Sequence, residues 1–116
     1  MAGQEKNNTL LADCLGQAHE LTNLIEYAKD SIVSKMILSK SVGSITLFAF
    51  DGGQSLSEHT SPYDAVVQVL DGTGRLTIGG QEKMVCAGQL IIMPANVPHA
   101  VIAEERFKML LIMIRA

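Results

Sequence analysis

The chain has 116 residues, of which 47% are apolar and 18% are charged, and its formal net charge is −3. This length and composition predict one compact domain and argue against a disordered chain. Nine basic residues against twelve acidic ones leave no positive excess for a phosphate backbone, so we expect no nucleic-acid partner.

The N-terminal residues 1–12 are predicted to be a flexible leader, and they lack the layout of a signal peptide. The longest unbroken apolar run, Met109–Ile114, is far shorter than the ~20 residues of a membrane span. Cys14 and Cys86 form no metal or redox motif, and we expect two buried or partly buried thiols, with a disulfide as the alternative. The chain is therefore expected to be cytoplasmic, with no membrane partner.

After the leader, the apolar residues between Leu15 and Ala28 recur every three or four positions. That spacing is typical of one face of a helix, so we predict a short N-terminal helical segment over Leu15–Ala28.

From Ile32 onward the chain is rich in β-branched and aromatic residues, and turn signals such as Asp71-Gly72 interrupt it. The pair Gly79-Gly80 predicts a two-residue hairpin, because both positions tolerate a positive φ. Many short strands without intervening helices predict an all-β barrel or sandwich. The clearest predicted strands are Ile32–Leu38, Ser44–Phe50, Ala65–Leu70, Arg75–Ile78 and Leu90–Met93.

The last predicted strand, Phe107–Ile114, is apolar on both faces except at Lys108. One face of a strand can line a barrel interior, but the other must be covered as well. We expect a homodimer to cover it, since exposed apolar patches usually mark interaction sites. The alternative is that Leu15–Ala28 folds back over this face.

Two of the three histidines follow a glycine-led turn and lie next to a proline. The first stretch runs from Gly53 through His59 to Gly72, and the second runs from Gly88 through Pro94 to His99. These spacings resemble the two motifs of the cupin superfamily, G-x5-H-x-H-x3,4-E-x6-G and G-x5-P-x-G-x2-H-x3-N. The resemblance covers residues 44–115 and implies a double-stranded β-helix, the jelly-roll barrel of cupins, over a single domain at residues 13–116.

The departures from the motifs concern the metal ligands. Metal-binding cupins supply three histidines and a carboxylate or amide, but here Ser61 and Ala65 occupy two of those positions. His59 and His99 remain, and Asp64 is a possible third ligand for Zn, Mn, Fe or Ni. The resemblance therefore implies a degenerate or weak site for a divalent transition metal.

The same strand pattern predicts a ligand pocket. His59, Ser61 and His99 are expected to converge at one barrel mouth, with Ala65, Val67 and Val101 as part of an apolar wall. The third histidine, His19, is read as an ordinary surface or partly buried residue. The chain's methionines are read as core fillers, although thioethers select Cu(I).

Three functions remain open at this point. The first is binding of a small molecule in the barrel, with a weak metal site or none. The second is a metal-dependent oxygenase or isomerase that uses His59 and His99. The third is a structural or regulatory dimer with a vestigial pocket, because this fold hosts many functions. Whether the protein is an enzyme is therefore left open.

Overall fold

The computed structural model describes residues 10–115, which form two short helical turns and eight β-strands. The predicted all-β fold is confirmed, and no helix among the described residues is long and apolar enough to cross a membrane. The elements are α1 (Leu11–Cys14), η2 (Leu21–Asn23), β1 (Ile32–Lys40), β2 (Gly43–Phe50), β3 (Ser55–His59), β4 (Asp64–Ile78), β5 (Gln81–Cys86), β6 (Leu90–Met93), β7 (His99–Ile102) and β8 (Phe107–Ile114).

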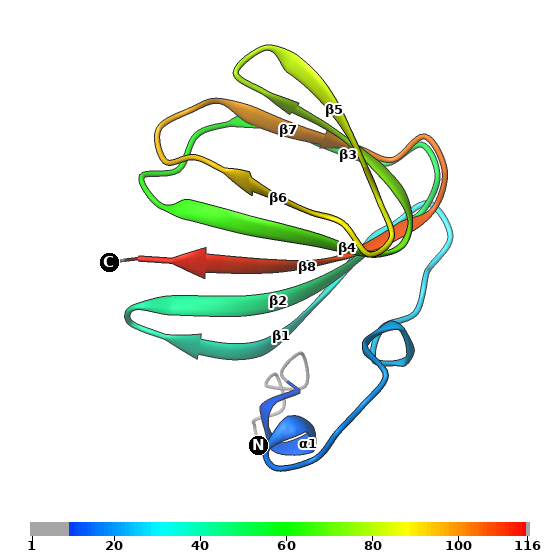
Figure 1. The fold of residues 1–116 in the computed structure, drawn as a ribbon. Coiled ribbons are helices and arrows are strands. Elements are labelled where there is room, and N and C mark those ends of the chain that lie inside the picture. The colour runs from blue at the N-terminus through cyan, green and yellow to red at the C-terminus, as the bar shows by residue number, and fades with distance from the viewer. Residues whose placement is uncertain (1–9, 116) are drawn as a thin grey trace.

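The strands pair antiparallel and curl into two facing layers (Figure 1). One layer contains β1, β2, β8, the first half of β4, and β6. The other contains β5, the second half of β4, β7 and β3. The strand β4 therefore belongs to both layers and joins them.

The predicted turn at Asp71-Gly72 is wrong, because β4 runs through it. The pairing of β4 with β8 shifts register between Val69 and Asp71, and Gly72 has a φ of +75°. A side chain at Gly72 would collide with the carbonyl oxygen of Arg106. The glycine thus bends one long strand from the first layer into the second instead of ending it.

The hairpin predicted at Gly79-Gly80 is confirmed. Ile78 pairs with Gln81, and the two glycines have φ values of +59° and +83°. Positive φ at both central residues defines the type I′ turn that fits the twist of adjacent strands. Asn96 also has a positive φ, of +65°, in the turn before β7.

The predicted short N-terminal helical segment is confirmed as two separate turns, α1 and η2, but no continuous helix spans Leu15–Ala28. The helix α1 ends at Cys14, and Gly16 follows it with a φ of +67°. Only the three residues of η2 are helical after that. The apolar spacing reflects contacts with the sheet, because Leu24 and Ile25 both pack on it from a mostly extended segment.

The N-terminal segment covers part of the outer face of the first layer. The sequence offered this arrangement as the alternative to a homodimer. Ile25 is fully buried against Leu47, Ala49 and Leu110, and the segment lies beside the β1 edge in Figure 1. The cover ends farther along β8, where Ile114 is 50% exposed.

Polar contacts fix this segment to the sheet. Lys108 is 92% buried, its Nζ donates to the carbonyl oxygen of Thr22 at 2.6 Å, and it lies 4.9 Å from the centre of the Tyr27 ring. The Tyr27 hydroxyl donates to Asp71 at 2.6 Å. Burial and this hydrogen bond raise the pKa of Tyr27, so the hydroxyl keeps its proton at neutral pH.

The barrel interior is packed from both layers and is closed at one end by aromatic rings. Phe50 and Phe107 are fully buried and stack with ring centres 4.7 Å apart. The aliphatic residues Val67, Val69 and Leu76 fill the space beside them. The opposite end of the barrel is less completely filled, and the cavity described next lies there.

Candidate functional site

A cavity of about 100 Å³ lies inside the barrel, between the two layers. It lies at the end where β3 and β6 stop and where β4 and β7 begin. Two short connections, residues 60–63 and 94–98, join these strand ends and so bring both layers together here. The lining residues are Phe48, Leu56, His59, Ser61, Ala65, Met93, His99, Val101, Met109, Leu111 and Met113.

Two imidazole rings form the polar end of this cavity. His59 and His99 are paired residues of β3 and β7, and their Nε2 atoms are 3.1 Å apart. The rings meet edge to face, with centres 4.4 Å apart. His99 is 95% buried, whereas His59 lies at the exposed rim. We call these two residues the histidine pair.

Backbone carbonyls fix the tautomer of both rings. The Nδ1 of His59 is 2.8 Å from the carbonyl oxygen of Ser57, and the Nδ1 of His99 is 3.2 Å from that of Val97. A carbonyl oxygen can only accept, so each Nδ1 carries a proton and donates it. Each Nε2 is therefore an acceptor, and a close contact between two acceptors is favourable only when a proton or another cation lies between them.

Burial opposes a positive charge at this position. Desolvation lowers the pKa of His99, and the neighbouring His59 lowers it further, while the hydrogen bond to Val97 acts in the opposite direction. Burial therefore favours the neutral form of the His99 ring, whose Nε2 is then an acceptor.

The structure brings together five of the six pocket residues proposed from the sequence. The histidine pair, Ser61, Ala65 and Val101 all line the cavity. The Ser61 hydroxyl oxygen accepts from the amide of Tyr63 at 3.1 Å, which leaves its own proton free to donate to a ligand. Val67 is the exception, because it is fully buried in the core and is not among the lining residues.

Asp64 lies apart from the histidine pair. It is exposed, and its Oδ1 accepts from the amide of Ala95 at 2.8 Å, so it ties two turns together. Over residues 10–115, no three His, Cys, Asp or Glu side chains are grouped as a metal site requires. Zn, Mn, Fe and Ni sites use at least three protein ligands, so two imidazoles without a carboxylate do not fit them.

Sequence reasoning missed Phe48, Leu56 and Met93 as cavity residues, whereas strand alternation does place one face of Phe107–Met113 on the cavity wall. Met93 and Met113 are both register partners of Ala65, and all three side chains face the cavity. Leu56 and Phe48 complete the wall. Strand alternation could have found Met93, since it ends the predicted strand Leu90–Met93, but a methionine in a strand is usually core filler.

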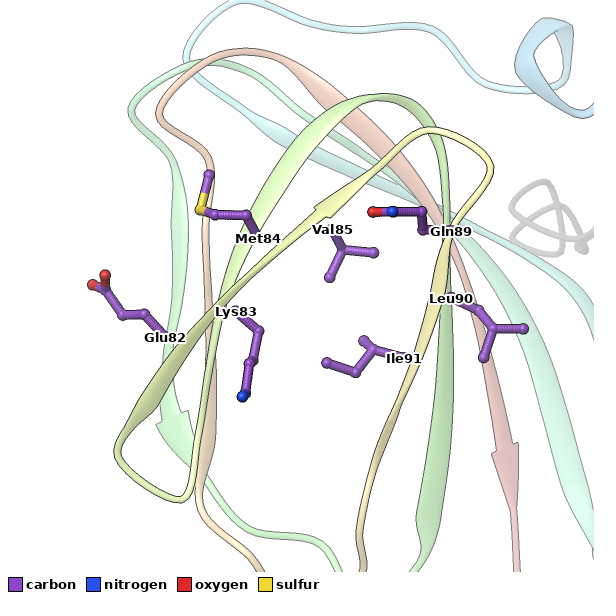
Figure 2. A pocket seen from close by; sticks show the side chains of 7 residues that line it. All are labelled: Glu82, Lys83, Met84, Val85, Gln89, Leu90 and Ile91. Atoms are coloured by element: carbon purple, nitrogen blue, oxygen red, sulfur yellow. The ribbon is translucent and has the colours of Figure 1, made fainter.

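A larger hollow of about 560 Å³ lies on the flank of the barrel, between β5 and β6. Figure 2 shows Val85 and Ile91 projecting into this gap, with Lys83 beside them and Met84 on the other side of β5. It is an open groove formed because β5 and β6 pair only with β4 and then diverge. None of the described residues that line it is a histidine or a serine.

Both cysteines of the described chain are free. The absence of a disulfide agrees with the expectation from the sequence. Cys14 is half-buried as expected, but Cys86 is exposed because it ends β5 at the outer rim of the groove.

Comparisons with known proteins agree with this architecture. A family model described as "Cupin domain" matches residues 46–115. A conserved protein of unknown function from Streptococcus pyogenes is 36% identical, with a TM-score of 0.82 over 86% of this chain and 88% of that one. No curated protein matches.

Two further solved structures are similar. A cupin 2 conserved barrel domain protein from Leptotrichia buccalis is 44% identical, with a TM-score of 0.78 over 80% of this chain but only 45% of that one. A cupin superfamily protein from Desulfitobacterium hafniense is 28% identical, with a TM-score of 0.82 over 86% of this chain and 92% of that one.

Proposed function

The chain belongs to the cupin family, and we propose on that basis that it binds a small molecule in the barrel cavity, with the ligand's polar group at the histidine pair. One observation carries this proposal. The cavity has an apolar wall from both layers and three polar side chains, those of the histidine pair and Ser61, at one end. Ligand sites in proteins commonly combine a concave apolar wall with a few convergent polar groups.

The size of the cavity limits the ligand. A cavity of about 100 Å³ is smaller than the roughly 150 Å³ cavity that holds a benzene ring. On the scale of roughly 30 Å³ for each water in the liquid, it holds about three non-hydrogen atoms, so a ligand of about four to six such atoms must extend past the exposed rim at His59. The polar groups offer two Nε2 acceptors and one hydroxyl donor, which favours a ligand whose polar end can both donate and accept a hydrogen bond.

Chemistry at this site would be acid–base chemistry by an imidazole. The histidine pair can hold one proton between its Nε2 atoms and can transfer it to a ligand oxygen within hydrogen-bond reach. A divalent-metal oxygenase or isomerase is not our proposal, because the donors in the cavity do not fit such a metal.

A change at Ala65 tests the proposal. Leucine at this buried position, between Met93 and Met113, fills the cavity without adding a polar group. The matched control is Val66→Leu, one residue later on the opposite face of the same strand. The probes are butyrate, butanamide and butanol, measured by thermal shift and by chemical shifts of the histidine ring protons.

We expect at least one probe to raise the Tm and shift the histidine signals in the wild type and in Val66→Leu, but not in Ala65→Leu. Equal responses in Ala65→Leu and the wild type would place binding outside the barrel and contradict the proposal. No response in any of the three proteins would favour the third function, a structural protein with a vestigial pocket.

We also propose that the uncovered part of the outer face forms a homodimer. Ile112, Val66 and Ile92 are register partners across β8, β4 and β6, and Ile92 is 52% exposed. Light scattering after size exclusion tests this. We expect a dimer for the wild type and a monomer for Ile92→Glu, with Met84→Glu, on the other layer, as the control. A monomeric wild type would contradict the proposal.

A further inference from the structure

The cavity contains sulfur ligands that the small-molecule proposal does not use. Three methionines, Met93, Met109 and Met113, line the same 100 Å³ space as the histidine pair. They come from two strands of the first layer, β6 and β8, while the histidines come from the facing layer. The methionine and histidine side chains therefore enter the cavity from opposite layers.

Two of these methionines lie on either side of Ala65, at the end of the cavity that carries the histidine pair. Met93 and Met113 are both register partners of Ala65, whose small side chain leaves the space between them unfilled. Met93 is the last residue of β6, and the turn that follows it leads directly to His99 at the start of β7. Met109 lies deeper, in the row of Val69. Met93 and Met113 are thus the thioethers best placed to share a ligand with the histidine pair.

The nitrogen geometry points to a cation. Both Nδ1 atoms face carbonyl oxygens, so both Nε2 atoms are free acceptors, and they lie 3.1 Å apart. Two nitrogens bound to one metal ion at roughly 2.0–2.1 Å lie roughly 2.9–3.4 Å apart for angles between square and tetrahedral. The observed separation of the two nitrogens lies within that range.

The charge of the cavity selects a monovalent ion. Among the described residues that line it, none is a carboxylate or a thiol, so no ligand neutralises a metal's charge. The cost of transferring an ion into an apolar interior rises with the square of its charge, so it is about four times greater for a divalent than for a monovalent ion of equal size. Neutral imidazole and thioether donors together favour Cu(I), the soft ion that thioethers select.

We propose that the histidine pair, together with the thioethers of Met93 and Met113, binds one Cu(I) ion at the polar end of the barrel cavity. In this proposal the ion lies between the two Nε2 atoms, where it relieves the contact between two acceptors. The proposal goes beyond small-molecule binding and does not depend on it.

The test is an anaerobic competition between the purified protein and the Cu(I) chelator bicinchoninate, followed by the absorbance of the chelator complex. The variants are Met93→Leu/Met113→Leu, which keeps the apolar volume, and His99→Gln. The matched controls are Met84→Leu and His19→Gln, which change exposed residues outside the cavity. Circular dichroism before copper addition identifies variants that do not fold, and only folded variants are compared.

We expect one equivalent of Cu(I) in the wild type and in both controls, with affinity at least tenfold weaker in the double methionine variant and in His99→Gln. X-ray absorption at the copper edge should show both nitrogen and sulfur neighbours in the wild type, and nitrogen alone in the double methionine variant. This spectrum is measured on any variant that retains copper, so it separates loss of thioether ligation from a general effect on the fold.

Three results would overturn the proposal. The first is unchanged Cu(I) affinity in the double methionine variant, which would leave the methionines as core fillers. The second is a Zn(II) or Ni(II) affinity equal to that for Cu(I). The third is equal loss of copper in His19→Gln, which would indicate adventitious surface binding. None of these results bears on the butyrate, butanamide and butanol experiment, so the two proposals can fail separately.

Discussion

The two faces of β8 are nearly equal in apolar character but are buried in different ways. The inner face, which carries Phe107 and Met109, packs against side chains of the facing layer. The outer face, which carries Leu110, packs against the N-terminal segment. The same face carries the buried Lys108, whose Nζ donates to a carbonyl oxygen of that segment. The inner face depends on apolar packing, whereas the outer face depends on packing and on hydrogen bonds to a separate segment. Apolar sequence thus indicates that a face is covered, without indicating what covers it.

The largest effect is expected on the inner face, for Phe107→Ala. Phe107 is fully buried and stacks on Phe50, so its loss leaves a cavity that the surrounding strands cannot close. Such changes cost about 3–5 kcal/mol in the free energy of unfolding. Urea denaturation followed by circular dichroism measures this. A loss below about 1 kcal/mol would mean that the surrounding strands do move to close the cavity, which would contradict the expected rigid packing.

A smaller effect is expected on the outer face, for Ile25→Ala. Ile25 is fully buried between the N-terminal segment and Leu47, and truncation of a buried isoleucine costs about 2–5 kcal/mol. We expect a value near the lower limit, because a segment can move to fill the gap more easily than a strand can. Denaturation of this variant beside Leu15→Ala, a control at a 64% exposed residue, measures it. Equal stability of the two variants would show that the segment does not pack on the sheet in solution.

The polar attachment of the outer face is tested by Lys108→Met, which keeps the length of the side chain. It removes the hydrogen bond to Thr22 and the contact with the Tyr27 ring, at a cost of about 1–2 kcal/mol after the gain from a more apolar side chain. Hydrogen exchange of residues 20–27 should accelerate, while that of β4 should not. Equal acceleration in both regions would mean that the cover and the barrel open together.

The smallest effect on stability is expected when the pH is lowered, and it concerns the contacts of Asp51 and Arg106 near Tyr27 of the N-terminal segment. The hydrogen bond from Arg106 lowers the pKa of Asp51, assisted by the amide of Asp30, and the Arg106 guanidinium lies 5.0 Å from the centre of the Tyr27 ring. The stability that Asp51 contributes is therefore present above the ordinary aspartate pKa of about 3.9 and is lost as the pH falls through the lower folded value. Urea midpoints between pH 6 and pH 3 should fall less in Asp51→Asn than in the wild type. A parallel decline in both proteins would assign the acid sensitivity to other carboxylates.

Much of the fold follows from local sequence signals. The hairpin at Gly79-Gly80 was predictable because a type I′ turn has a strict residue requirement. Asp71-Gly72 was misread because a glycine with positive φ serves equally in a turn and in a bulge, and only the pairing of β4 with β8 distinguishes them. The apolar periodicity of Leu15–Ala28 was misread because a segment that packs on one sheet also shows regular apolar spacing.

The site was predictable to the extent that it follows strand alternation. His59, Ser61 and Ala65 could be assigned to one face of consecutive strands, and they do line one cavity. Val67 could not be separated from them, because alternation gives the direction of a side chain but not its depth in the barrel. The approach of Met93 to this end of the cavity depends on which strands pair with β4, and sequence spacing does not contain that information.

The bend of β4 at Gly72 also bears on the order in which this protein can open. Because β5, β6, β7 and β8 all pair with β4, neither layer can be completed until this strand is in place. Its amides should therefore exchange with solvent only when the whole domain unfolds, whereas the β1 edge, which pairs only with β2, can detach alone. A single strand thus makes the two layers one cooperative unit, and the folding of this barrel must await contacts distant in sequence.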